Sequence, residues 1–265
     1  MGDPVTYLFV PGDRPERFGK ALASAADRVI LDLEDAVRPE AKAAARQAIR
    51  EADLDWSRVV IRINAGAEGA EDHGVLRTVA AAGVLVPKAE DADALIAVRE
   101  AAAREIEVIP QIETVRGLEG VGALLAAPGV RRAAFGHLDF SLDLGVAPDW
   151  DALAWVRSRL VYASRLAGAS APVDSVTPDL SDTDALAREA FDSRRFGFGG
   201  KLLIHPKQIA PVLAAFAPSD DEIAWAKRVV KAVEAGASGA VAVDGKMIDR
   251  PVEDAARRIL GRAGG

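Results

Sequence analysis

The chain alternates short apolar runs with longer Ala-rich helical patterns, and this alternation repeats eight times. The apolar runs are short and continuous, as expected for parallel strands that are buried on both faces. Eight strand–helix repeats favour an α/β protein with a closed (β/α)8 TIM barrel over an open doubly wound sheet. The expected strands are Tyr7–Val10, Arg28–Leu33, Val59–Asn64, Gly83–Pro87, Val108–Ile112, Ala133–Phe135, Pro172–Ser175 and Lys201–His205.

A helical pattern follows each expected strand. The third helix is expected near Glu71–Ala81, after a Gly-rich loop at Ala65–Gly69, and a longer loop follows the sixth strand. No Gly-x-Gly-x-x-Gly motif follows the first strand, which weakens the dinucleotide-binding alternative. The remaining expected helices are Pro15–Ala26, Glu40–Glu51, Asp91–Ala103, Val115–Leu125, Trp150–Ala167, Thr183–Arg194 and Pro206–Ala215.

The residues after position 216 lie outside the eightfold count. We expect a catalytic barrel domain over residues 1–216 and a C-terminal helical and hairpin extension over residues 217–265. Because a closed barrel has no room for further strands, this tail either caps its own barrel or packs on a neighbouring subunit. Its expected parts are the helix Ile223–Glu234, a flexible break at Gly236–Gly239, a hairpin that joins Ala240–Val243 to Met247–Asp249 through Asp244–Gly245, and the helix Val252–Leu260.

Charge and composition exclude several classes of function. A formal net charge of −7 favours neither nucleic acid nor an anionic membrane as a partner. No apolar run reaches the roughly 18 residues of a membrane-spanning helix. The absence of cysteine excludes disulfides, thiolate nucleophiles and Cys-ligated zinc. The start of the chain has no secretory signal pattern, so we expect a cytoplasmic protein.

Two carboxylates follow neighbouring strands of the expected barrel. Glu113 directly follows Val108–Ile112, and Asp139 follows Ala133–Phe135 one strand–helix unit later. Active sites of such barrels lie at the C-terminal ends of the strands, where these acids meet. A hard cation such as Mg2+ takes one or two carboxylates together with water and substrate. The alternative is that each acid only caps the helix that follows it.

Arg62 lies inside an apolar strand, where an arginine needs an anionic partner. One interpretation is an ion pair with Glu34 or Asp35. The other is a bidentate clamp for a substrate carboxylate, and the two are compatible within one network. Glu34 and Asp35 similarly either belong to a salt-bridge network with Lys88 and Arg62 or hold metal-bound water.

Three cations, Arg14, Arg17 and Lys20, follow the first strand. A solvated charged face is their ordinary interpretation, but their place beside Gly12 at the barrel mouth also suits a phosphate. A His-based zinc site has little support, because the chain has only three histidines. No strand end carries a serine in a nucleophile-elbow motif, so Ser–His–Asp catalysis is not indicated.

Several segments together resemble citrate lyase beta subunit-like proteins, of the Mg2+-dependent aldolase/citrate lyase group that includes citramalyl-CoA and malyl-CoA lyases. The resemblance covers almost the whole chain. The segments are Leu8–Arg17 (LFVPGDRPER), Ile30–Val37 (ILDLEDAV), Ile61–Asn64 (IRIN), Pro110–Thr114 (PQIET), Phe135–Phe140 (FGHLDF) and Gly245–Pro251 (GKMIDRP). Departures are the pair His137–Leu138 before Asp139 and a short loop after Asn64, either of which could change substrate choice.

The resemblance implies a role for each matching residue. Glu113 and Asp139 correspond to Mg2+ ligands, and Arg62 to the residue that binds the keto-acid carboxylate. Asp249 falls where these lyases supply a catalytic acid/base from the tail of a neighbouring subunit, usually in a homotrimer or a dimer of trimers. The positions that contact coenzyme A in relatives are Phe9, Arg14 and Lys20.

The implied reaction is the reversible cleavage of a 3-hydroxyacyl-CoA thioester, such as citramalyl-CoA, malyl-CoA or citryl-CoA, to an acyl-CoA and a 2-keto acid. Mg2+ would act as a Lewis acid and a template on glyoxylate, pyruvate or oxaloacetate. One alternative is an aldolase on free 2-keto-hydroxy acids, and the cations after the first strand argue against it. Another is a citrate lyase-like subunit that needs an acyl-carrier partner.

Overall fold

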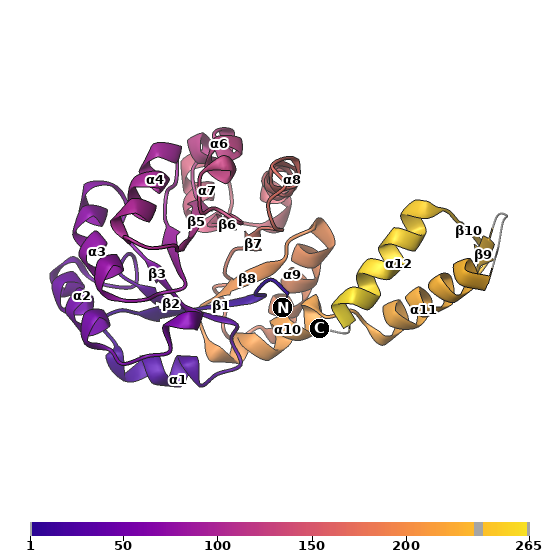
Figure 1. Ribbon diagram of the computed structural model, residues 1–265, viewed down its shortest axis with the longest axis horizontal. Coiled ribbons are helices and arrows are strands. Elements are labelled where there is room, and N and C mark those ends of the chain that lie inside the picture. Colours follow the sequence, from indigo (N-terminus) through magenta and orange to yellow (C-terminus); the bar gives the residue numbers. More distant parts are fainter. Residues whose placement is uncertain (1, 236–240, 264–265) are drawn as a thin grey trace. The chain divides into compact units, whose positions relative to one another are not determined.

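The structure, a computed structural model, describes residues 2–235 and 241–263. Eight parallel strands pair in chain order and close into a barrel, with β8 pairing back to β1 (Figure 1). The α/β (β/α)8 barrel is therefore confirmed, and every expected strand overlaps an observed one. The strands are β1 (Thr6–Pro11), β2 (Arg28–Asp32), β3 (Val59–Arg62), β4 (Gly83–Val86), β5 (Glu107–Ile112), β6 (Ala134–Phe135), β7 (Val173–Asp174) and β8 (Gly200–Leu203).

The helices of the barrel lie outside the strands (Figure 1). Several of them differ from the sequence-based expectation; the helix expected at Val115–Leu125, for example, is divided at Gly120 into two helices. The Gly-rich segment expected as a loop at Ala65–Gly69 is largely the first turn of α3 (Gly66–Thr78), and the long loop expected after the sixth strand contains α7 (His137–Leu144). The others are α1 (Phe18–Leu22), α2 (Lys42–Glu51), α4 (Ala92–Ala101), α5 (Val115–Glu119), α6 (Val121–Ala126), α8 (Trp150–Leu166), α9 (Thr183–Phe196) and α10 (Ile209–Phe216), with 3-10 turns η1 (Pro15–Arg17), η2 (Pro39–Ala41), η3 (Trp56–Arg58) and η4 (Pro206–Gln208).

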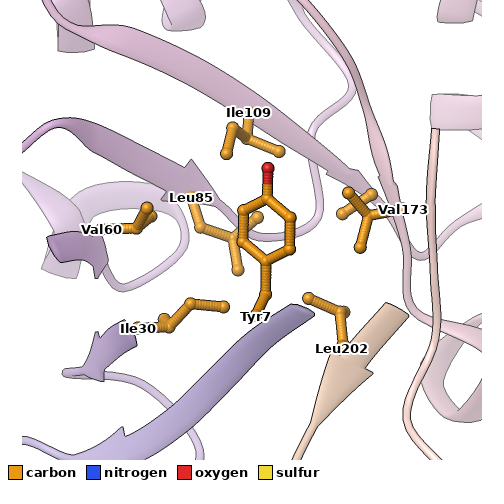
Figure 2. Close-up of a cluster of buried hydrophobic side chains, with 8 residues drawn as sticks. Tyr7, Ile30, Val60, Leu85, Ile109, Val173 and Leu202 are labelled. Carbon is orange, nitrogen blue, oxygen red and sulfur yellow. The ribbon is translucent and has the colours of Figure 1, made fainter. Parts of the chain in front are cut away.

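One buried layer fills the barrel interior, and each strand contributes one side chain to it (Figure 2). Side chains of a strand alternate between the interior and the helices, so the residue two positions later returns to the interior nearer the C-terminal mouth. The packed layer therefore closes the barrel beneath the mouth and sets the residues that face it. Its members are Tyr7, Ile30, Val60, Leu85, Ile109, Ala134, Val173 and Leu202.

A buried charged cluster joins β7 and β8 to α8 and α9. The Asp174 carboxylate accepts from Nε of Arg157 at 3.1 Å and from the Ser193 hydroxyl. Lys201 donates from Nζ to the Ser175 carbonyl at 2.7 Å. Burial raises the pKa of Asp174, but the charges of Arg157 and Lys201 outweigh it and lower that pKa overall. The carboxylate thus remains charged and holds two elements against the sheet.

The C-terminal residues form a small unit of their own, because contacts divide the chain into Pro4–Leu213 and a unit of Ala214–Gly265 with Met1–Asp3. Its elements are α11 (Asp220–Ala235), β9 (Val241–Val243), β10 (Lys246–Ile248) and α12 (Arg250–Ala263). This matches the expected helical and hairpin extension, whereas the break expected at Gly236–Gly239 lies outside the described residues. Within the described chain, no helix combines the length and apolarity needed to cross a bilayer.

Candidate functional site

A cavity of about 310 Å³ opens at the C-terminal ends of the strands. Its lining follows from the packed layer, since seven of the eight positions two residues beyond that layer line the cavity, and Pro87 is the exception. The sequence alternation of the strands therefore builds the floor of the site directly. The lining residues are Phe9, Asp32, Asp35, Ala36, Arg62, Gln111, Glu113, Gly136, Leu138, Asp139, Ser175, Val176, Leu202 and Ile204.

Glu113 is held in place on both carboxylate oxygens. Oε1 accepts from Nε2 of Gln111 at 2.7 Å, and Oε2 accepts from the backbone N–H of Lys88 at 3.0 Å. The carboxylate passes so close to Gly136 that a Cβ at that position would overlap it. Glycine at 136 is therefore a requirement of the site, and Glu113 is fixed before any ligand arrives.

The electrostatic setting of Glu113 favours a cation. The side chain is 2% exposed. Burial, followed by the negative charges of Glu34 and Asp139, raises the pKa of Glu113 to about 8. A divalent cation between these carboxylates would reverse that balance by favouring the charged form.

Asp139 lies in the first turn of α7 and lines the cavity. It is thus not at a strand end, as the sequence suggested, because the chain turns into α7 directly after Gly136. Its carboxylate has no hydrogen bond or ion pair to any part of the protein that the structure describes. The acid is exposed enough to take a ligand and is not committed elsewhere.

The helix-capping alternative for the two acids is wrong. Thr114, not Glu113, caps α5 by accepting from the backbone N–H of Gly117 at 3.0 Å. Gly136 stands at the N-cap of α7, and no side chain caps that helix. Capping of the following helix therefore explains the place of neither carboxylate.

The donor set fits Mg2+ better than a metal that needs a closed protein cage. No group of three or more His, Asp or Glu side chains in the described part of the chain is placed to hold a metal ion. Two carboxylates that face one cavity, with space for water and substrate, are the partial ligand set that Mg2+ uses. Glu113 and Asp139 are the residues that would hold it.

One side of the Arg62 guanidinium is paired with acidic side chains. Nε and Nη2 donate to the two oxygens of Asp32 at 2.6 Å each, and Nη1 lies 3.0 Å from Oε2 of Glu34. Burial opposes the charge, but the bonds and charge of Asp32, with Glu34 and Asp35, raise the pKa of Arg62. The expected ion pair is present, with Asp32 as the principal partner, while the guanidinium still lines the cavity.

Lys88 connects this network to Glu113. It has a left-handed backbone with φ of +47°, uncommon for a residue other than glycine, and this conformation aims its N–H at Glu113. Its Nζ lies 3.0 Å from Oε1 of Glu34. Burial alone would lower the pKa of Lys88, but the bond and charge of Glu34 raise it, followed by Glu113 and Asp139. The ammonium thus remains charged beside three acids.

The remaining candidate residues are more widely spread. The ring of Phe9 lines the cavity and stacks on Arg62, with 4.7 Å from its centroid to Cζ. Arg14 and Lys20 are exposed after β1 and do not line the cavity. Asp249 lies in the C-terminal unit, where its Oδ1 accepts from the backbone N–H of Val252 at 3.2 Å and so caps α12.

Sequence reasoning missed three contributors to the site. Gln111 is a polar residue near the end of the apolar run Val108–Ile112, two positions before Glu113, and that spacing could have identified it. Gly136 precedes α7 and gave no local signal, because its need arises from Glu113 on another strand. Ser175 lines the cavity, and its Oγ lies 2.6 Å from Nδ1 of His137.

Comparison with known proteins identifies the family of the chain. The model of the family described as HpcH/HpaI aldolase/citrate lyase matches residues 6–206. A citrate lyase subunit beta-like protein of Mycobacterium tuberculosis (strain CDC 1551 / Oshkosh) is 41% identical over 267 residues, covering 97% of this chain and 95% of the relative. An L-malyl-CoA/beta-methylmalyl-CoA lyase of Cereibacter sphaeroides (strain ATCC 17025 / ATH 2.4.3) is 34% identical, covering 91% of this chain and 89% of the relative.

A solved structure extends the similarity to the whole fold. The crystal structure of protein CitE from Mycobacterium tuberculosis, in complex with magnesium, acetoacetate and coenzyme A, matches with a TM-score of 0.89 and 39% identity. The match covers 99% of this chain and 98% of that one. The chain therefore belongs to the HpcH/HpaI aldolase/citrate lyase family.

Proposed function

We propose that this protein is a Mg2+-dependent carbon–carbon lyase that cleaves a 3-hydroxyacyl-CoA thioester reversibly to an acyl-CoA and a 2-keto acid. The observation that carries the proposal is the convergence of Glu113, Asp139 and Arg62 on one cavity, with neither acid used as a helix cap. The names of the malyl-CoA lyase relative and of the CitE complex with magnesium, acetoacetate and coenzyme A support a Mg2+-dependent lyase that acts on coenzyme A thioesters.

Arg62 binds and orients the carboxylate of the keto acid in this proposal. Two of its five N–H groups donate to Asp32, and Nη1 lies 3.0 Å from Oε2 of Glu34 without a hydrogen bond, so N–H groups of Nη1 and Nη2 remain for a bidentate bond. Asp32 and Phe9 fix the plane of the guanidinium and thus the orientation of the bound acid. Glu34 and Asp35 hold water beside the metal in this proposal.

Glu113 and Asp139 hold Mg2+, which when bound supplies Lewis-acid polarisation of the substrate oxygens. In the cleavage direction the substrate hydroxyl loses its proton to a base, and the electron pair of the C–C bond passes to the thioester enolate. Asp249 donates the proton that converts this enolate to the acyl-CoA, and removes it in the reverse direction.

The coenzyme A moiety contacts Phe9, Arg14 and Lys20 in this proposal, because Phe9 lines the cavity and the two cations are exposed on the segment after β1. We further propose residues 1–216 as the catalytic domain and residues 217–265 as an extension that packs on a neighbouring subunit. Such packing would deliver Asp249 to the site of a neighbour in a homotrimer or dimer of trimers. The proposed location is the cytoplasm.

A substrate screen with the purified chain tests the proposal. Citramalyl-CoA, malyl-CoA and citryl-CoA are incubated with Mg2+, and free 2-keto-hydroxy acids are incubated in parallel. Mg2+-dependent release of a 2-keto acid from a thioester is the expected result. Cleavage of the free acids alone would favour the aldolase alternative, and activity only after adding an acyl-carrier protein would favour the subunit alternative.

A further inference from the structure

The cavity at the barrel mouth has two different walls. Acids and Arg62 come from the arc of β2, β3, β5 and the start of α7. The arc of β7, β8 and β1 contributes apolar side chains instead, with the single exception of the Ser175 hydroxyl. The apolar wall consists of Phe9, Val176, Leu202 and Ile204.

The described lining of the cavity has no cationic side chain left to pair with a second carboxylate of the substrate. Arg62 is the one cationic side chain among the described lining residues, against Asp32, Asp35, Glu113 and Asp139. Two of its N–H groups already donate to Asp32 and Nη1 is paired with Glu34, so the guanidinium has one remaining edge, which can bind a single carboxylate. The Lys88 ammonium is 3.0 Å from Glu34 and does not line the cavity.

Ser175 does not change the character of the apolar wall. Its Oγ accepts from the backbone N–H of His137 at 3.1 Å and lies 2.6 Å from Nδ1 of the same residue. His137 itself does not line the cavity, so the pair adds a neutral hydroxyl and no charged group to this wall.

Resting on the proposed function, we propose that the keto acid of this enzyme is a 2-keto monocarboxylate whose short alkyl substituent packs on Phe9, Val176, Leu202 and Ile204. A second carboxylate, as in oxaloacetate, would lose its water against this wall without gaining a cation. The matching thioesters are of the citramalyl-CoA type, with an alkyl group on the carbinol carbon, rather than of the citryl-CoA type.

Two nearly isosteric probes test this inference. 2-Ketobutyrate and oxaloacetate differ mainly in a terminal methyl against a terminal carboxylate, and their binding to wild-type protein with Mg2+ is measured by titration calorimetry. We expect 2-ketobutyrate to bind at least about tenfold more tightly. Equal binding, or tighter binding of oxaloacetate, would overturn the inference.

The Glu113→Gln variant distinguishes failure of the inference about the keto acid from failure of the proposed function. If wild type binds both acids and the variant binds neither, the metal site is present and the ratio of the two affinities decides the inference. If neither acid binds to wild type with Mg2+, the proposed function and the inference fall together.

A cation placed on the apolar wall should reverse the preference. Ile204 lines the cavity and is 39% exposed, so Ile204→Arg can add a guanidinium at modest structural cost. Leu166→Arg is the matched control, because Leu166 is 75% exposed on α8 and does not line the cavity. We expect Ile204→Arg to shift the affinity ratio about tenfold or more toward oxaloacetate, while Leu166→Arg keeps the wild-type ratio. An unchanged ratio in a folded Ile204→Arg protein would contradict the assignment of this wall.

Discussion

At the scale of single residues, Glu113 is the most constrained group of the site. Its two oxygens accept from Gln111 and Lys88, and Gly136 lies against it. Burial and neighbouring acids nevertheless make its charge unfavourable in the metal-free protein. A buried carboxyl group with a strongly raised pKa is common at functional sites.

The raised pKa of Glu113 predicts that the stability of the fold depends on pH. The pKa of Glu113 rises from 4.5 in the unfolded chain to about 8 in the fold, so the folded state holds a proton that the unfolded state releases. Its stabilising contribution is complete below pH 4.5 and is lost as the pH rises through 8. The free energy of unfolding in EDTA should therefore fall with pH by about 1–3 kcal/mol more in wild type than in Glu113→Gln.

Glu113→Gln is a suitable control because the neighbouring Gln111 side chain can form a hydrogen bond with the new amide. Oε1 of Gln111 is buried with no hydrogen-bond partner, and a flip of this amide would let it accept from the new side-chain amide. Mg2+ at pH 8 should restore stability in wild type and leave Glu113→Gln unchanged. Parallel pH profiles for the two proteins would show that Glu113 does not carry this proton.

Arg62→Lys tests the carboxylate clamp. One ammonium cannot reproduce two bonds to Asp32 and a further pair to a substrate, so keto-acid binding should weaken by about 2–5 kcal/mol. Calorimetry with Mg2+ and a 2-keto acid gives this value, and a urea unfolding curve checks the fold. Wild-type affinity in the lysine variant would assign Arg62 a structural role only.

At the scale of elements, the strands could be predicted from the sequence, whereas two helix starts could not. The strands are continuous apolar runs, and that pattern is sufficient for the barrel. Residues 66–69 read as a loop because glycine is a poor helix former, yet they begin α3, whose Asp72 is buried and accepts from Asn64. α7 follows β6 without a connecting loop, and its eight residues alternate polar and apolar side chains, a pattern that does not indicate a helix.

The cluster that joins α8 and α9 to the sheet predicts a large stability effect. Asp174→Asn removes the charge that balances buried Arg157 and Lys201, and should lower the free energy of unfolding by about 3–5 kcal/mol. Asp192→Asn on α9 is the control, since its pair with Arg195 is a partly exposed surface pair. Its cost should stay below about 1 kcal/mol in urea unfolding, and similar values for the two variants would refute the account of the cluster.

At the scale of the whole molecule, counting the eight expected strands predicts where the barrel ends and the C-terminal extension begins. The same count does not predict the function of the extension. The sequence predicted the helices and the hairpin of the extension, because each has an ordinary amphipathic or turn pattern. A residue of the C-terminal unit, Asp249, acts in our proposal on the barrel site of a neighbouring subunit. No local pattern could establish that relation.

Asp249→Ala tests the proposal for the tail. The variant should keep Mg2+ and keto-acid binding but lose turnover, because it lacks the group that moves the proton at the thioester carbon. Asp249→Ala also removes the N-cap of α12. Asp249→Ser, whose hydroxyl can still cap the helix, should therefore be as inactive as Asp249→Ala but more stable. Full turnover in the serine variant would limit Asp249 to capping.

Mixing variants tests whether Asp249 acts between subunits. Chains with Asp249→Ala and chains with Glu113→Gln are each inactive in our account, but a mixed oligomer contains some sites with both residues intact. Partial recovery of activity after mixing and reassembly is therefore expected. No recovery, or a monomer at assay concentration, would contradict a shared site.

The most direct test of the central claim is the rate of keto-acid release from a 3-hydroxyacyl-CoA thioester as a function of free Mg2+. Wild type should show a saturable dependence on Mg2+ and no activity in EDTA. Glu113→Gln and Asp139→Asn should remain folded yet lose the Mg2+ dependence together with turnover. Turnover in EDTA, or wild-type rates in both variants, would contradict the assignment of this cavity as a Mg2+-dependent lyase site.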